Sequence, residues 1–145
     1  MNQDKVCLDD DIIYYLYGAG TLGKILGEYM QNQDVRIRGY IDKRADEMDM
    51  LIGIPVFSVD EFMPANIDKV CIIIAVKDVF EHEKIKDIFL ERSINKIIYR
   101  PQNVLDGKGT EVEKEVNRVY DSIVNYNFKK GAILPITVPN EVVNK

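Results

Sequence analysis

The chain has 145 residues, 46% hydrophobic and 30% charged, a balance that excludes a disordered chain and predicts a folded globular one. Its net charge of −5 and pI of about 4.9 argue against nucleic acid as a partner, because binding phosphate backbones requires a basic face. The apolar run 70–76 is far shorter than the roughly 20 residues that span a bilayer. Residues 1–10 show no signal-peptide core, and Cys71 falls in that apolar run away from Cys7, so we expect a cytoplasmic protein without a disulfide.

Apolar runs that alternate with helical patterns predict a parallel α/β sheet. Strands are expected at 12–17, 35–41, 54–57, 69–76 and 96–99, and helices at 21–32 and 78–92. Between them, 42–53 reads as a loop with a helical turn, Pro55 places its strand at a sheet edge, and Ser58 with Glu61 forms a capping box that opens a brief helix. Right-handed crossovers then predict a Rossmann-like, three-layer αβα fold with five parallel strands in the order 3-2-1-4-5.

The character of the sequence changes after Pro101, so we divide the chain into an α/β domain at 1–101 and an extension at 102–145. Thr110 and Glu113 form a second capping box, and an apolar stripe at helical spacing follows at Val112, Val116, Val119, Ile123 and Tyr126. An extended tail is expected at 132–139. The stripe either covers the sheet or pairs with another copy or domain, and we predict a homodimer in which this segment takes part.

A glycine pattern follows the first expected strand and opens the first expected helix, as Gly18-Ala19-Gly20-Thr21-Leu22-Gly23. Gly18 allows a tight turn, Gly20 lets a pyrophosphate approach the backbone, and Gly23 lets the helix lie close to the strand. Free N–H groups at the start of the helix, together with the helix dipole, attract phosphate groups. This context predicts a nucleotide-binding site at 18–23.

An acidic residue, Asp42, ends the second expected strand nineteen residues after Gly23. A carboxylate there can accept a hydrogen bond from a ribose 2′-hydroxyl and repels a 2′-phosphate, which favours NAD over NADP. Lys43 and Arg44 follow directly, and basic residues at this place can hold a 2′-phosphate. We therefore predict NAD as the cofactor and keep NADP as the alternative.

Four segments also carry a family resemblance: YGAGTLGK at 17–24, GYID at 39–42, GIPV at 53–56 and IIIAV at 72–76. They resemble Rossmann-type NAD(P)- or nucleotide-sugar-binding domains of bacterial polysaccharide biosynthesis proteins, over residues 11–100. Such domains precede membrane-linked sugar-nucleotide dehydratases and epimerases. Related domains precede sugar acyltransferases, and there the same glycine loop holds a UDP-sugar. The resemblance implies that the glycine turn touches phosphate, that Asp42 touches ribose or base, and that Ala75, Val76 and Lys77 line the pocket floor.

Three further residues carry side chains that can take part in acid–base or metal chemistry. Tyr126 and Lys130 have the Y-x-x-x-K spacing of short-chain dehydrogenases, but Tyr126 also continues the apolar stripe, so we predict no catalytic residue. His82 is the single histidine and has no partners at metal-ligand spacing, so no metal site is expected. Its place near the carboxyl edge of the sheet leaves two interpretations, an ordinary helix residue or a ligand contact.

These observations predict a nucleotide-binding domain for NAD(H), linked to nucleotide-sugar or polysaccharide metabolism. Its catalysis would reside elsewhere, in a dehydratase, epimerase or oxidoreductase of which it is a domain or partner. The alternatives are a UDP-sugar-binding module and an assembly domain without a ligand. The predicted binding residues are Gly18, Ala19, Gly20, Thr21, Leu22, Gly23, Asp42, Lys43, Ala75, Val76 and Lys77.

Overall fold

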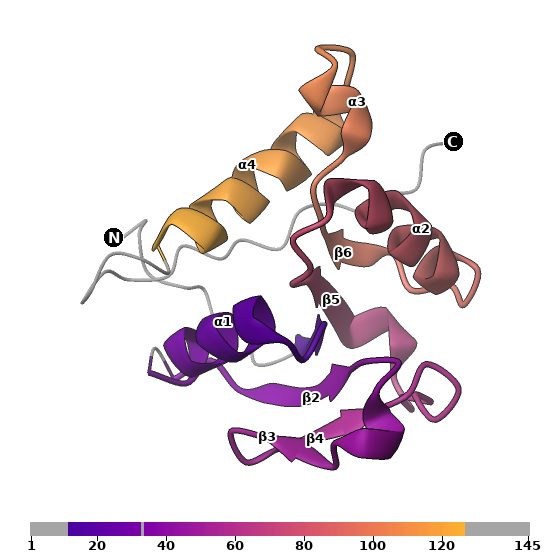
Figure 1. Cartoon of the computed structure of the whole chain (residues 1–145). Helices are drawn as coiled ribbons and strands as arrows, with labels where there is room; N and C mark the ends of the chain where they lie inside the picture. Colours follow the sequence, from indigo (N-terminus) through magenta and orange to yellow (C-terminus); the bar gives the residue numbers. More distant parts are fainter. Residues whose placement is uncertain (1–11, 33, 127–145) are drawn as a thin grey trace.

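The computed structural model describes residues 12–32 and 34–126 as an α/β fold with a six-stranded, mostly parallel sheet and four helices (Figure 1). The strands are β1 (Ile13–Tyr17), β2 (Ile37–Ile41), β3 (Met50–Leu51), β4 (Ile54–Phe57), β5 (Val70–Ile74) and β6 (Lys96–Ile98). The helices are α1 (Thr21–Asn32), α2 (Val79–Leu90), α3 (Gln102–Leu105) and α4 (Glu111–Tyr126).

The strands lie in the order β3-β4-β2-β1-β5-β6 and pair in parallel, except for β3 with β4. The α/β class is confirmed, whereas the expected count of five strands in the order 3-2-1-4-5 is wrong. The difference is β3, which pairs antiparallel with β4 across a turn at Ile52 and Gly53, both at positive φ. Because β3 takes the edge and Met50 pairs with Pro55, β4 is not the edge strand that its proline indicated.

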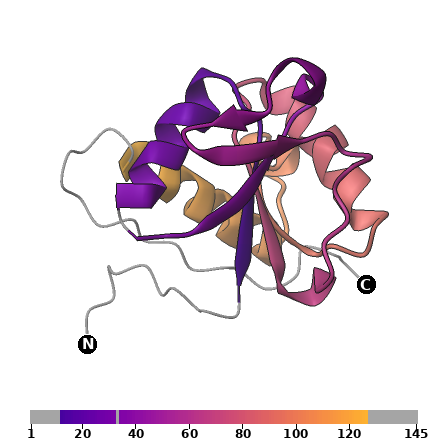
Figure 2. The same cartoon turned by 90° about the horizontal axis from the view of Figure 1, so that it is seen from below.

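Helices cover both faces of the sheet, with α1 on one side and α2 on the other (Figure 2). Helix α4 lies on the side of α1 but also reaches the cluster of α2 through Val116. On the first side, Met30 of α1 and Val119 of α4 pack in one buried cluster with Ile73 of β5. On the second side, Phe89 of α2 packs in another cluster with Ile72. Every residue of β5 is buried, as expected of a central strand that is covered on both faces.

Both predicted capping boxes form, but only one opens a helix. In the first, the Ser58 N–H donates to Glu61 Oε1 at 2.8 Å and the Glu61 N–H donates to Ser58 Oγ at 3.1 Å. This pair closes a turn, so the helix expected there is wrong. In the second, the same reciprocal bonds join Thr110 and Glu113 at 2.9 and 3.1 Å and open α4.

Arg100, just after β6, holds α4 against the sheet. Its guanidinium lies 4.8 Å from the centre of the Tyr120 ring, donates to Asn117 Oδ1 at 3.3 Å and forms an ion pair with Asp121. Val116 and Val119 of the apolar stripe are buried, so this part of the stripe covers the chain's own core. The expected homodimer stays a prediction.

Several predictions fall outside the described residues: those on Cys7, on Lys130 and on the tail 132–139. Cys71 is a free, buried thiol, and burial raises its pKa to about 12. Among the helices of the described part, none is both long and apolar enough to cross a bilayer.

Candidate functional site

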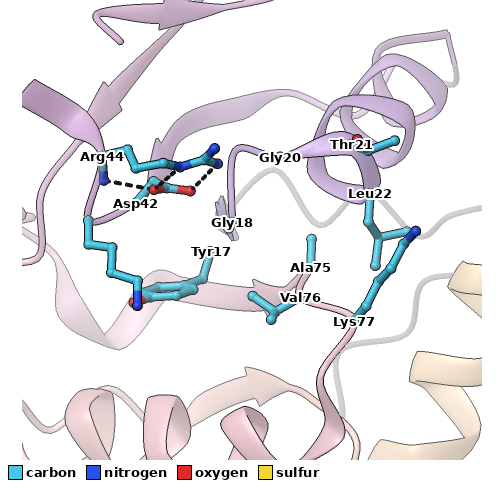
Figure 3. Close-up of a pocket in the computed structure, with 11 residues that line it drawn as sticks. Tyr17, Gly18, Gly20, Thr21, Leu22, Asp42, Arg44, Ala75, Val76 and Lys77 are labelled. Atoms are coloured by element: carbon cyan, nitrogen blue, oxygen red, sulfur yellow. Dashed lines mark hydrogen bonds and ion pairs between the residues drawn. The ribbon is translucent and has the colours of Figure 1, made fainter. Parts of the chain in front are cut away.

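A pocket of about 390 Å³ lies at the carboxyl edge of the sheet, where the segments after β1, β2 and β5 meet (Figure 3). Its volume falls within the range of about 300–1,000 Å³ that is usual for small-molecule sites. The residues that line it are Tyr17, Gly18, Gly20, Thr21, Leu22, Asp42, Lys43, Arg44, Ala75, Val76 and Lys77.

The turn after β1 has the geometry that its glycines allow. Gly18 has a backbone φ of +113°, a value that residues with a side chain rarely adopt. Its backbone N–H donates to the Ile41 carbonyl at 2.8 Å. A β-carbon on Gly23 would lie 1.8 Å from the Gly18 carbonyl oxygen. The Tyr40 hydroxyl donates to the Gly23 carbonyl at 2.7 Å. These contacts fix the start of α1 directly beside the pocket.

The first turn of α1 supplies the positive end of a helix dipole. The Gly20 carbonyl accepts the Lys24 N–H at 2.9 Å, so the N–H groups of Thr21, Leu22 and Gly23 precede the first bond of the helix ladder. This turn contains no acidic residue that would offset the dipole. Backbone donors and dipole together favour an anion at this place.

Asp42 is buried at the end of β2 and is bonded from two sides. Its Oδ2 accepts from the Ala19 N–H at 2.7 Å, and Arg44 donates to both of its oxygens. Burial by itself raises the pKa of Asp42, but the hydrogen bonds from Arg44 and Ala19 outweigh it and hold the pKa below its ordinary value. The carboxylate is therefore ionised and serves to hold Arg44.

Three cationic side chains line the pocket: Lys43, Arg44 and Lys77. In Figure 3, Arg44 lies on one side of the glycine turn, whereas Lys77 lies on the other and extends toward Leu22. Since the acid that lines the pocket, Asp42, is already paired with Arg44, the lining carries surplus positive charge in a chain of net charge −5. Such a site favours an anionic ligand.

The predicted site residues are brought together at this pocket, with two exceptions. Ala19 is 3% exposed and its N–H is taken by Asp42, and Gly23 packs against Gly18, so neither residue lines the cavity. Two lining residues were missing from the predicted set, Tyr17 and Arg44. Tyr17 is the last residue of β1, directly before the turn, which is the signal that would have found it. The sequence indicates Arg44 only as a basic residue, beside Lys43, that can hold a 2′-phosphate.

His82 does not line the pocket, but it hydrogen-bonds to Val76, which does. Its side chain is 1% exposed, and Nδ1 accepts the Arg100 N–H at 3.0 Å. This bond assigns the ring proton to Nε2, which donates to the Val76 carbonyl at 2.6 Å. Burial lowers the pKa of His82, and the nearby Arg100 lowers it further. His82 is therefore neutral and ties a segment that lines the pocket to the end of β6.

Within the described residues, no group of three or more His, Cys, Asp or Glu side chains is placed to hold a metal ion. A scan against protein-family models finds no matching family, and searches of curated proteins and of solved structures find no match.

Proposed function

We propose that this chain is a Rossmann-like nucleotide-binding domain that holds the diphosphate of a nicotinamide dinucleotide, NAD(H) or NADP(H), with catalysis residing elsewhere. The observation that carries the proposal is one pocket in which the turn at 18–20, the start of α1 and three cations converge. The family resemblance of residues 11–100 extends the proposal to nucleotide-sugar or polysaccharide metabolism, and to a dehydratase, epimerase or oxidoreductase as the catalytic partner.

The arrangement of the lining supports a ligand with a central anionic group. A diphosphate over Gly20 would meet the backbone donors of the first turn of α1. Lys77 lines the same pocket and extends toward Leu22 (Figure 3), so it would add positive charge there. The pocket extends to both sides of the turn, toward Arg44 and Tyr17 on one side and toward Leu22 on the other. Room on both sides favours two nucleosides joined by a diphosphate.

A nucleotide-sugar-binding module is the second candidate. The cavity of about 390 Å³ lies near the lower end of the range for ligand sites, which favours a ligand shorter than a dinucleotide. A UDP-sugar would use the same phosphate contacts and would place its uracil near Asp42.

Gly20→Val tests both candidates, because it fills the pocket without disturbing the fold. A β-carbon on Gly20 would lie 3.5 Å from the Arg44 Nη2 atom, an ordinary van der Waals contact. We expect calorimetry to show micromolar NADH binding, about −8 kcal/mol, that weakens by at least about 30-fold in Gly20→Val, or about 2 kcal/mol. The midpoint temperature of thermal unfolding of Gly20→Val should stay close to that of the unmodified chain.

The control is Asn32→Val, which adds the same side chain at the exposed end of α1 and should leave affinity unchanged. Binding of UDP-N-acetylglucosamine without binding of NADH or NADPH would establish the second candidate in place of the first. If none of these ligands bound, both candidates would be wrong and an assembly role would replace them.

A further inference from the structure

Asp42 has no hydrogen-bonding capacity left for a ligand hydroxyl. A carboxylate offers about four lone-pair positions, and four donors fill them. Oδ2 accepts from the Ala19 N–H at 2.7 Å and from Arg44 Nη2 at 3.1 Å. Oδ1 accepts from the Arg44 backbone N–H at 2.8 Å and from its Nε at 3.0 Å. A ribose hydroxyl could bond to this carboxylate only if one of these bonds broke, so the role expected for Asp42 does not fit its surroundings.

Arg44 is the group that the pocket offers in place of that carboxylate. A guanidinium has five N–H donors, and the two bonds to the Asp42 side chain leave three of them for a ligand. The Arg44 side chain is 48% exposed, and its Nη2 atom would lie 3.5 Å from a β-carbon on Gly20. Figure 3 shows it extending from Asp42 toward the glycine turn.

The chemistry of this end of the pocket suits a phosphate dianion. The two-pronged contact with Asp42 fixes the plane of the Arg44 guanidinium, so little side-chain freedom is lost when it binds a phosphate. Lys43 lines the same end of the pocket and adds a second cation. A phosphate group would use the donors that remain, whereas a hydroxyl would have to compete with Arg44 for Asp42.

We propose that Arg44, held by Asp42, makes the pocket selective for nucleotides that carry a phosphomonoester on the ribose. This inference rests on the nucleotide-binding function proposed above, because a diphosphate over Gly20 places a ribose at the end of β2. Two positions on the ribose satisfy the same chemistry, a 2′-phosphate and a 3′-phosphate. For nicotinamide dinucleotides the inference reverses the preference that Asp42 indicates in the sequence, from NAD to NADP.

The test compares three ligands that differ by a single phosphate: AMP, adenosine 2′,5′-bisphosphate and adenosine 3′,5′-bisphosphate. In calorimetry with the full chain, we expect at least one bisphosphate to bind about tenfold more tightly than AMP or better, the effect of one charge-assisted hydrogen bond. NADPH should exceed NADH by a similar factor if the 2′ position is the one recognised.

Arg44→Gln should abolish the advantage of the bisphosphate while AMP still binds. Arg44→Lys keeps the charge without the planar fork and should retain only part of the advantage. Lys77→Gln removes the same charge on the other side of the turn and should weaken AMP and the bisphosphates alike. Arg36→Gln, an exposed change ahead of β2, should alter neither.

The preferred bisphosphate identifies the ligand class, a 2′-phosphate as in NADP or a 3′-phosphate as in other adenosine nucleotides. Equal affinity for AMP and both bisphosphates would overturn this inference and leave the nucleotide-binding function standing. A bisphosphate advantage that persists in both Arg44 variants would also overturn it. Absence of binding by every nucleotide, NADH and NADPH included, would overturn the proposed function as well.

Discussion

Gly23→Ala should lower the free energy of unfolding by about 3 kcal/mol or more, the upper range for overpacking a close contact. The added β-carbon would lie 1.8 Å from the Gly18 carbonyl oxygen, a backbone atom that cannot rotate away. Either α1 moves off the turn or the turn itself opens. By intrinsic helix propensity alone, replacing glycine with alanine stabilises a helix by about 1 kcal/mol. A loss of stability in Gly23→Ala would therefore have the opposite sign to that propensity.

Urea unfolding of the full chain measures this loss, and Gly20→Ala is the matched control. Its β-carbon meets the end of the Arg44 side chain at 3.5 Å, so the expected change is within about 1 kcal/mol. The same distortion should abolish nucleotide binding in Gly23→Ala, because the donors of α1 would leave the pocket. Unchanged unfolding midpoints for both variants would contradict the close contact between α1 and the turn.

The sequence is informative about the parts of the fold that depend on local patterns. The glycine turn, the buried run of β5 and the capping box of Thr110 are visible because each requires particular residues at fixed spacing. The β3 strand is not, because two residues give no periodicity. Its turn, Ile52-Gly53, also lacks the Asn-Gly or Asp-Gly signal typical of such hairpins.

The candidate site likewise has one part that the sequence predicts and one part that it does not. Its position at the carboxyl ends of β1, β2 and β5 follows from the strand pattern, since parallel strands end at one edge. The bonding of Asp42 does not, because the residue type admits both a ribose contact and an ion pair. Only the side-chain geometry distinguishes them, through the contacts of Asp42 with Arg44 and Ala19.

The burial of His82 follows a helical pattern that the sequence already contains. The buried residues of α2 are His82, Ile85 and Phe89, at helical spacings of three and four, so the histidine continues the apolar face of the helix. Its ring also packs edge-on against Tyr120 of α4, with the ring centres 5.2 Å apart. It therefore joins α2, the end of β6 and α4.

His82→Ala should destabilise the chain by about 3 kcal/mol, from the cavity left by the ring and from two backbone groups that lose their partners. These are the Val76 carbonyl and the Arg100 N–H, which the ring bonds at 2.6 and 3.0 Å. His82→Gln keeps an amide donor for the Val76 carbonyl and should recover part of the loss. Urea unfolding at pH 7.5 compares the variants, and equal midpoints for all three chains would contradict a bridging role.

The same residue should make stability depend on pH. In the folded chain the pKa of His82 lies below its ordinary value of 6.5, because burial and Arg100 disfavour the cation. The unfolded chain therefore binds the proton first, and stability that is complete above about pH 6.5 is lost as the pH falls toward the folded pKa. The slope is limited to about 1.4 kcal/mol per pH unit for one proton.

The groups around the ring agree with that sign. Protonation of His82 at Nδ1 would break the hydrogen bond from the Arg100 backbone N–H. It would also place a cation beside the Arg100 guanidinium. Asp78 and Glu83 attract that cation, but the pKa of His82 is still lowered. Asp42 contributes no loss of stability between pH 7.5 and 5.5, because its pKa lies below the ordinary value of 3.8. Unfolding midpoints measured between pH 7.5 and 5.5 should therefore fall in the unmodified chain and fall less in His82→Gln. Equal slopes for the two chains would show that another group carries the dependence.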